Sequence, residues 1–72
     1  MTKILTIQYD GNDASKHIIN NEDEDYYYFI DGWTGEKKRL HKEKNYLEFE
    51  GLNGQWIRFT DWQKYIYKIK RT

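Results

Sequence analysis

The sequence predicts an all-β fold: an antiparallel meander of six or seven short strands, built from repeated hairpins and curled into a small barrel or a sandwich. Residues 27–40 and 46–59 match each other at a shift of 19 positions, and residues 6–19 form a fainter third copy. In each copy, two alternating segments flank a polar turn. Aromatic residues, which favour strands and supply bulk to a small core, make up 18% of the chain.

Length and composition predict one domain over residues 1–72 and a cytoplasmic location. A chain this short buries only about 60% of its unfolded surface, so its core is small. It has no cysteine, which excludes disulfides and thiolate metal sites and fits a reducing compartment. No apolar run is long enough to span a bilayer, and the first residues lack the apolar core of an export signal. We therefore expect no membrane partner.

The charges balance, with 12 basic and 12 acidic residues. A net charge of zero argues against a protein that wraps nucleic acid, and equally against an acidic mimic of DNA. Lys, Ile, Asn and Tyr are abundant while Pro is absent, a usage that follows AT-rich codons. The composition therefore indicates a low-GC bacterium or one of its phages.

The first copy is the least regular of the three. Its pattern predicts a hairpin that places Ile7 opposite Ile19 and Asp10 opposite Lys16. Ala14, however, stands where the other copies carry glycine, and alanine disfavours positive φ. The alternative is an α+β fold with one short helix near residues 13–20, capped by Asp13.

The second copy turns through residues 32–36. A three-residue loop there predicts that Tyr28 lies opposite Leu40, and that Ile30 lies opposite Lys38 at the sheet edge.

The third copy carries Asn53-Gly54, a strong hairpin motif. A two-residue loop would set apolar side chains against polar ones, whereas a three-residue loop places Phe49 opposite Ile57. The three-residue loop predicts a type I turn in which Gly54 adopts the left-handed conformation.

The three-residue loop of the third copy also sets Glu48 opposite Arg58. A short polar turn at residues 42–45 should pair Leu40 with Leu47 and Arg39 with Glu48, and residues 64–70 alternate as a last strand. One face of the sheet then collects the apolar side chains and must be covered by curling, by a second layer or by dimerisation. The predicted inward residues are Leu5, Ile7, Tyr9, Ile19, Tyr28, Ile30, Leu40, Leu47, Phe49, Ile57, Phe59, Tyr65, Tyr67 and Ile69.

For function, the sequence favours a binding module whose partner is a protein, with an interaction or regulatory role. Bulky apolar residues at two hairpin tips, and aromatic and cationic residues on the outer sheet face, are typical of interface contacts. The predicted contacts are Trp33 and Leu52 at the tips and Phe29, Arg39, Trp56 and Arg58 on the face. Trp62, in a bend, is expected in the core, and Trp33 could equally fold back over an open barrel end.

The alternative is single-stranded nucleic-acid binding, because rings interleaved with cations can stack bases and neutralise phosphates. Its predicted contacts are Lys37, Lys38, Arg39 and Arg58. If the basic residues of 36–44 and 64–71 lay on one side, they would form a single basic patch. The simpler interpretation is a solvated face with alternating charges and lysine-protected edges.

Residues 22–25 are four successive carboxylates, but they lack the alternating spacing and glycine of a calcium loop. We expect a solvated acidic loop there that contacts basic residues. His17 and His41 have no neighbouring ligand at metal spacing, and no nucleophile or phosphate-loop motif occurs. The sequence therefore predicts no enzyme, no cofactor and no metal.

Overall fold

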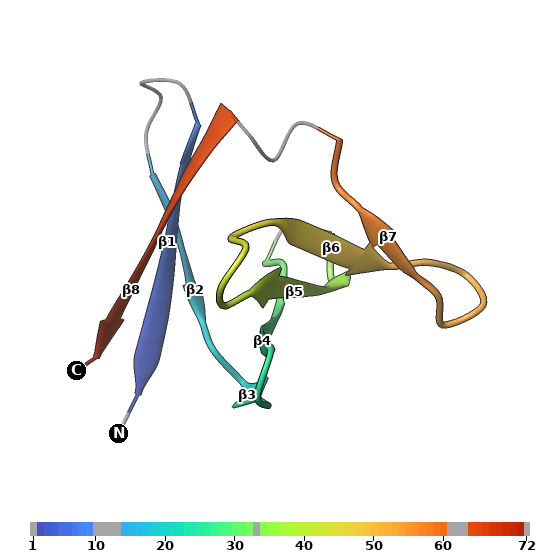
Figure 1. Ribbon diagram of the computed structural model, residues 1–72, viewed down its shortest axis with the longest axis horizontal. Coiled ribbons are helices and arrows are strands. Elements are labelled where there is room, and N and C mark those ends of the chain that lie inside the picture. The colour runs from blue at the N-terminus through green and yellow to red at the C-terminus, as the bar shows by residue number, and fades with distance from the viewer. Residues whose placement is uncertain (1, 10–13, 33, 61–63, 72) are drawn as a thin grey trace.

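The computed structural model describes residues 2–9, 14–32, 34–60 and 64–71. These residues form an all-β fold of eight strands in two antiparallel sheets (Figure 1). The predicted fold class is confirmed in its two-layered form. The predicted barrel is wrong, because within the described residues β2 does not pair with β3 and β7 does not pair with β8, so the strands form two separate sheets instead of one closed one.

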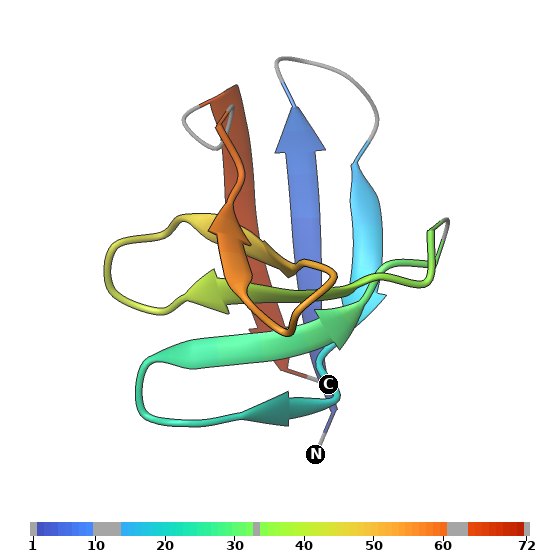
Figure 2. The ribbon, with the colours of Figure 1, turned by 90° about the vertical axis from the view of Figure 1, so that its right-hand side faces the viewer.

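The smaller sheet has three strands in the order β2-β1-β8. Its central strand is formed by the start of the chain, and the end of the chain lies beside it (Figure 2). The strands are β1 (Lys3–Tyr9), β2 (Ser15–Ile18) and β8 (Tyr65–Arg71).

The larger sheet is a meander of five strands in the order β3-β4-β5-β6-β7. The strand not expected from the sequence is β3, which has only two residues. The strands are β3 (Asn21–Glu22), β4 (Tyr26–Ile30), β5 (Lys37–His41), β6 (Leu47–Glu50) and β7 (Trp56–Arg58).

The core lies between the two sheets. Leu5 of β1 is fully buried against Phe29, Leu40 and Leu47 of the larger sheet. Further side chains that pack on this cluster are Ile7, Ile19, Tyr27, Phe59, Tyr67 and Ile69. Burying apolar side chains of this kind stabilises the fold by about 1.5–3 kcal/mol each.

The hairpin between β6 and β7 has the predicted register. Phe49 pairs with Ile57, and the loop closes with a hydrogen bond of 2.7 Å from the Gly51 amide to the Gln55 carbonyl. Gly54 has a φ of 73°, as the type I turn with a left-handed third residue requires. The predicted Leu40–Leu47 pair between β5 and β6 is also present.

The predicted register of the β4–β5 hairpin is wrong by one residue. Leu40 pairs with Tyr27 rather than Tyr28, and Asp31 donates its amide to the Glu36 carbonyl at 2.9 Å. The turn thus holds one residue more than predicted, and one residue of slip reverses both faces of a strand. Tyr27 and Phe29 consequently face the core, while Tyr28 and Ile30, predicted inside, face outward.

The β1–β2 pairing also differs from the prediction. Ile7 lies opposite Ser15 rather than Ile19, and the Ile19 amide donates to the Lys3 carbonyl at 3.0 Å. Because the shift is four residues, an even number, Ile7 and Ile19 still face the core. Residues 15–18 are a strand, so the alternative of a helix near residues 13–20 is wrong for the described part of that segment.

The pairing of β8 with β1 completes the inner face of the smaller sheet, which packs on the larger sheet. Leu5 lies opposite Ile69 and Ile7 opposite Tyr67, so the apolar sides of the two strands coincide. Tyr67 and Ile69 pack on the core as predicted. Ile57, which was predicted to lie inside, is 45% exposed. Tyr9 belongs to β1, but the structure does not describe its side chain. Trp62 lies outside the described residues.

Candidate functional site

The outer face of the five-stranded sheet carries most of the aromatic and charged side chains predicted to bind a partner. We call it the aromatic face. Tyr28, Arg39, Glu48 and Arg58 follow one another across β4 to β7 as directly paired residues. The other members of the face, from the same strand alternation, are Tyr26, Ile30, Lys37, His41, Tyr46, Glu50 and Trp56.

Arg39 is the central group of the aromatic face. Its Nε donates to Glu48 Oε1 at 2.8 Å, and its Cζ lies 3.9 Å from the Tyr26 ring centroid and 4.3 Å from that of Trp56. Burial is the largest single influence on the pKa of Arg39 and would lower it, but the hydrogen bonds to Glu48 and Tyr28, with the nearby charge of Glu48, together raise it. Because Arg39 is 17% exposed, this ion pair is shielded from water and holds two rings in place.

A second group of rings adjoins Arg39 around Tyr46. The Tyr26 and Tyr46 hydroxyls lie 3.1 Å apart, the His41 ring stacks on Tyr46 at 5.0 Å, and Arg58 Cζ lies 3.9 Å above the same ring. The hydrogen bond to Tyr46 is the largest cause that raises the pKa of Tyr26 to about 12. Tyr46 is only 8% exposed, so this part of the aromatic face is a small second core.

The aromatic face is concave. Tyr28 of β4 and Trp56 of β7 lie three strands apart, which is about 14 Å in a flat sheet. Their ring centroids are only 5.9 Å apart. In Figure 2, β7 crosses in front of β5 and β6, which agrees with a sheet that curls toward this face.

The curled sheet leaves an open groove of about 370 Å³ beside Tyr28 and Trp56. Its lining is mainly apolar, with amides and one lysine at the margin. The lining residues are Asn20, Asn21, Tyr28, Phe29, Ile30, Lys37 and Trp56. Ile30 is 55% exposed, so an apolar side chain stands open to solvent within the groove.

The structure places the predicted protein-contact residues unequally. Arg39, Trp56 and Arg58 lie on the aromatic face, and Leu52 is fully exposed at the tip of the β6–β7 hairpin. Phe29 was expected on this face, and that expectation is wrong, because the longer β4–β5 turn directs it into the core, where it is 1% exposed. Trp33 lies outside the described residues.

The four cations predicted for nucleic-acid binding do not form one surface. Lys37 is exposed on the aromatic face, 4.0 Å from Glu50, whereas Lys38 points to the other side of β5 and pairs with Asp31 at 2.6 Å. The basic residues of 36–44 and the C-terminal basic residues do not lie on neighbouring strands, because β5 and β8 belong to different sheets.

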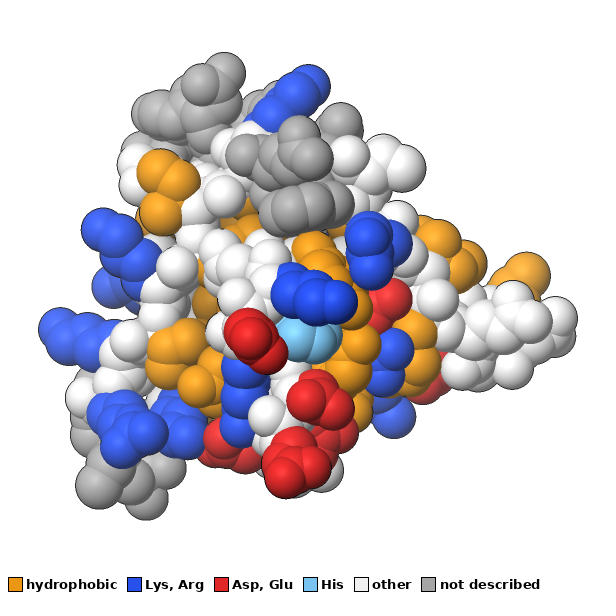
Figure 3. Space-filling view, viewed as in Figure 1, with side chains coloured by type: hydrophobic (Ala, Val, Ile, Leu, Met, Phe, Trp, Pro, Cys, Tyr) orange, Lys and Arg blue, Asp and Glu red, His pale blue; other side chains and the backbone are white. Residues whose placement is uncertain are grey.

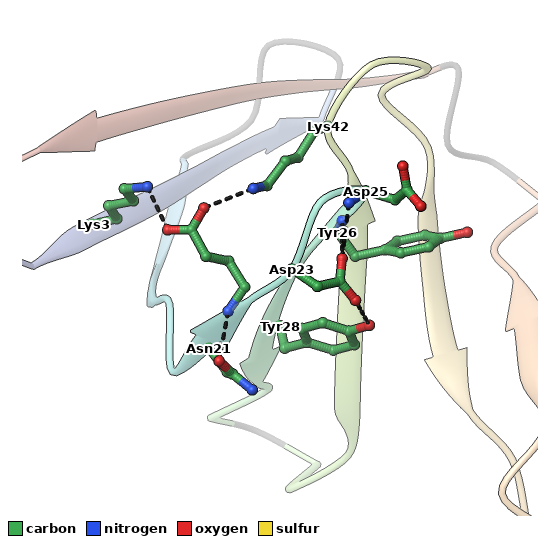
Figure 4. A network of polar contacts seen from close by, with 8 residues as sticks. Lys3, Asn21, Asp23, Asp25, Tyr26, Tyr28 and Lys42 are labelled. Atoms are coloured by element: carbon green, nitrogen blue, oxygen red, sulfur yellow. Dashed lines mark hydrogen bonds and ion pairs between the residues drawn. The ribbon is translucent and has the colours of Figure 1, made fainter.

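Within the exposed acidic residues 22–25, the side chains of Glu22 and Asp23 make contacts that stabilise the fold. The carboxylate of Glu22 accepts hydrogen bonds from Lys3 of β1 and, at 2.7 Å, from Lys42 beyond β5 (Figure 4). These bonds, that from Lys3 first, lower the pKa of Glu22 to about 2. The contact joins the two sheets, and it confirms at Glu22 the expected contact of the acidic residues with basic ones, although the sequence did not identify Lys3 and Lys42 as the partners.

Asp23 closes the turn before β4. It accepts the amides of Asp25 and Tyr26 at 2.9 and 2.7 Å and the Tyr28 hydroxyl at 2.6 Å (Figure 4). The bond from Tyr28 is the first cause that lowers the pKa of Asp23. Tyr28 is therefore fixed at both the ring and the hydroxyl on the aromatic face.

The histidines are packing groups in this arrangement. The His17 ring lies 4.9 Å from that of Phe29, and desolvation lowers its pKa. His41 Nδ1 accepts the backbone amides of Glu43 and Lys44 at 3.2 and 2.9 Å. Within the described ranges, no three His, Asp or Glu side chains are grouped to hold a metal ion, and no helix is long and apolar enough to cross a membrane.

No protein-family model matches the chain. No curated protein and no solved structure matches it significantly either.

Sequence reasoning found the Arg39–Glu48–Arg58 row but missed Tyr26 and Tyr28 as members of the aromatic face. Residues 26–29 are all aromatic, so they carry no alternation that would separate inward from outward positions.

Proposed function

We propose that this protein is a non-enzymatic binding module that takes an apolar side chain of a protein partner into the groove on the aromatic face. The observation that carries the proposal is the groove itself, in which Tyr28, Ile30 and Trp56 present apolar surface beside the cation of Lys37. Aromatic residues around a partly enclosed pocket are typical of the energetic centre of protein interfaces.

The groove is held in shape before a partner arrives. Arg39 lies against Trp56 and is itself fixed by Glu48, while Asp23 holds the Tyr28 hydroxyl. Side chains that are already ordered lose little conformational entropy on binding. This arrangement supports tight capture of an aromatic or branched aliphatic side chain, with Lys37 available to an adjacent carboxylate.

Leu52 supplies a second contact. It is fully exposed at the tip of the β6–β7 hairpin, while Ile57 on the inward side of β7 is 45% exposed. A partner segment that fills the groove beside Trp56 of β7 and extends toward the tip would cover Leu52. We therefore include Leu52 in the interface, in keeping with the residues expected from the sequence.

Protein binding is favoured over single-stranded nucleic-acid binding by the state of the arginines. Arg39 is bonded to Glu48 and lies between two rings, and Arg58 covers the Tyr46 ring. Bases need free ring faces and phosphates need free cations. Because both arginines of the aromatic face already lie against rings, a phosphate would have to displace these contacts.

The wider role that we propose is regulatory, in the cytoplasm of a low-GC bacterium or its phage. The support is compositional: the chain has no cysteine and follows AT-rich codon usage.

The test is selection from a random-peptide display library against the wild-type protein, with the variant Ile30→Asp as counter-selection. Ile30 is 55% exposed, so this change fills the groove with charge while leaving the core unaltered. We expect enriched peptides with one aromatic or aliphatic anchor next to an acidic residue. Their binding should shift the amide resonances of Tyr28, Ile30 and Trp56 and should persist at 0.5 M salt, roughly five times the ionic strength at which the Debye length is about 10 Å.

A control variant and an oligonucleotide titration distinguish protein binding from single-stranded nucleic-acid binding. Lys44→Asp, a change at another exposed position that does not line the groove, should leave peptide binding intact. Peptides that bind wild type and Ile30→Asp equally would refute the groove as the site. Salt-sensitive binding of a mixed-sequence single-stranded oligonucleotide with shifts at Arg39 and Arg58 would favour the nucleic-acid function instead.

A further inference from the structure

The outer face of the three-stranded sheet is basic and partly apolar. Leu5, Ile7, Tyr67 and Ile69 face the core, so the even-numbered residues of β1, β2 and β8 face outward. We call this surface the basic face; its residues are Ile4, Thr6, Gln8, Lys16, Ile18, Ile66, Lys68 and Lys70. Two of its isoleucines, Ile18 and Ile66, are 62% and 52% exposed.

All charged residues of these three strands are positive. β1, β2 and β8 carry Lys3, Lys16, Lys68, Lys70 and Arg71 and no aspartate or glutamate. In Figure 3, Lys and Arg side chains gather at the left, where Figure 1 places this sheet, while Asp and Glu gather in the lower middle of the view. A chain of zero net charge thus separates its charges into a basic sheet and a more acidic remainder.

β8 lies at one edge of the basic sheet, and among the described strands it pairs with β1 alone. The hydrogen bond from the Ile19 amide to the Lys3 carbonyl shows that odd-numbered residues of β1 direct their backbone groups toward β2. Even-numbered residues of β1 therefore bond to Ile66, Lys68 and Lys70 of β8, which lie opposite them.

The remaining backbone groups of β8 point the other way. The N–H and C=O groups of Tyr67, Ile69 and Arg71 are directed to the open edge, since successive residues of an antiparallel strand alternate in direction. Among the described strands none pairs with β8 along this side of Tyr67, Ile69 and Arg71, and an open edge of this kind is a template for another strand.

We propose that the open edge of β8 binds an acidic, extended segment of another protein as an added strand. Main-chain hydrogen bonds to Tyr67 and Ile69 would supply affinity, and side chains on the outer side of the added strand would lie beside Ile66, Lys68 and Lys70. Alternating carboxylates and apolar groups match that row, because opposite charges on neighbouring strands attract.

The charges of β8 also exclude the simplest competitor, a second copy of the same strand. Two β8 strands side by side would bring Lys68 and Lys70 near their own counterparts, and like charges across a strand pair are destabilising. Nucleic acid fits less well, because the strand residues of the basic face include no aromatic ring for base stacking and only three lysines. The surface lies on the opposite sheet from the groove, so this proposal does not depend on the proposed function.

The test is amide hydrogen exchange by NMR, with and without a ten-residue peptide that alternates glutamate and valine and has blocked ends. In the free protein, the amides of Tyr67 and Ile69 should exchange fast and those of Lys68 and Lys70 slowly. With the peptide, Tyr67 and Ile69 should become protected, while Lys68 and Lys70 keep their rates. Unchanged exchange at Tyr67 and Ile69 under saturating peptide would overturn the proposal.

Charge reversal separates strand addition from general attraction to a basic surface. The double variant K68E/K70E should bind the acidic peptide about tenfold more weakly or worse, and should gain binding to the matched lysine–valine peptide. K16E makes the same charge change on the same face but lies two strands from β8, so its effect should stay below about twofold. Equal weakening by K16E, or binding of a mixed-sequence oligonucleotide in place of the peptide, would contradict strand addition.

Discussion

Replacing Arg39 by methionine should destabilise the protein far more than replacing any exposed lysine. The substitution removes the hydrogen bond to Glu48, worth about 1.5–3 kcal/mol for a charged pair. It also removes the cation from the Tyr26 and Trp56 rings, at about 0.5–1 kcal/mol for each ring. The methionine chain keeps part of the packing, so we expect a total loss of about 3 kcal/mol.

The size of this loss matters because small domains are marginally stable. A chain of this length has a free energy of unfolding of about 4–11 kcal/mol, and each 1 kcal/mol lowers its melting temperature by about 4–8 °C. Urea unfolding followed by tryptophan fluorescence measures the change, and Lys37→Met is the matched control. Lys37 is 55% exposed and 4.0 Å from Glu50, so the control should lose less than about 0.5 kcal/mol.

A second substitution isolates the ion pair. Glu48 is only 9% exposed, so Arg39→Met leaves a shielded carboxylate without its partner. Adding Glu48→Gln to Arg39→Met should therefore recover about 1 kcal/mol. A loss below about 1 kcal/mol for Arg39→Met, or a further loss in the double variant, would refute the view that Arg39 organises the aromatic face.

Three further predictions concern the fold. The buried Tyr67 hydroxyl has no hydrogen-bond partner among the described residues, so Tyr67→Phe should raise the free energy of unfolding by about 1 kcal/mol in urea titration. Tyr26→Phe removes a hydroxyl that is hydrogen-bonded and should lower the free energy of unfolding in the same titration. The folded-state pKa of Glu22 is lowered to about 2, so its contribution to the free energy of unfolding is fully present above the unfolded pKa near 4.5 and is lost as pH falls toward 2. Glu22→Gln should therefore flatten the fall in melting temperature between pH 5 and pH 2. An unaltered slope would contradict the contact with Lys3 and Lys42. Gly54→Ala should cost about 1 kcal/mol because φ is 73°, while Gly32→Ala, at ordinary φ and with no atom within 4 Å, should be nearly neutral by thermal unfolding.

Local patterns in the sequence predicted the β6–β7 hairpin completely. Asn53-Gly54 marks the turn, and strict alternation on both sides leaves one register that keeps Phe49 and Ile57 together. The same reasoning found Arg39 beside Glu48, because the two residues belong to adjoining strands joined by a short turn.

The β4–β5 hairpin shows where such reasoning ends. Tyr26 to Phe29 are all aromatic, so hydrophobicity cannot say which of them faces the core. The turn after Asp31 accepts either loop length, and one added residue exchanged Phe29 for Tyr28 on the aromatic face.

The sequence also did not predict the contacts between segments that lie far apart in the chain. The pairing of β1 with β8 joins the two ends of the chain, and a meander of hairpins gives no local indication of it. The same holds for Glu22, whose partners Lys3 and Lys42 stand 19 and 20 positions away. The basic edge of β8 therefore became visible only once the strand order was known.

The groove depends on Tyr28 and Trp56 meeting on the outer side of a curled sheet, and a two-dimensional NOE spectrum tests this most directly. We predict cross-peaks between the Tyr28 ring protons and the Trp56 indole protons, whose ring centroids are 5.9 Å apart, and cross-peaks from Phe29 to the methyl groups of Leu5. Cross-peaks between Phe29 and Trp56, with none between Tyr28 and Trp56, would place Phe29 outside and contradict the groove.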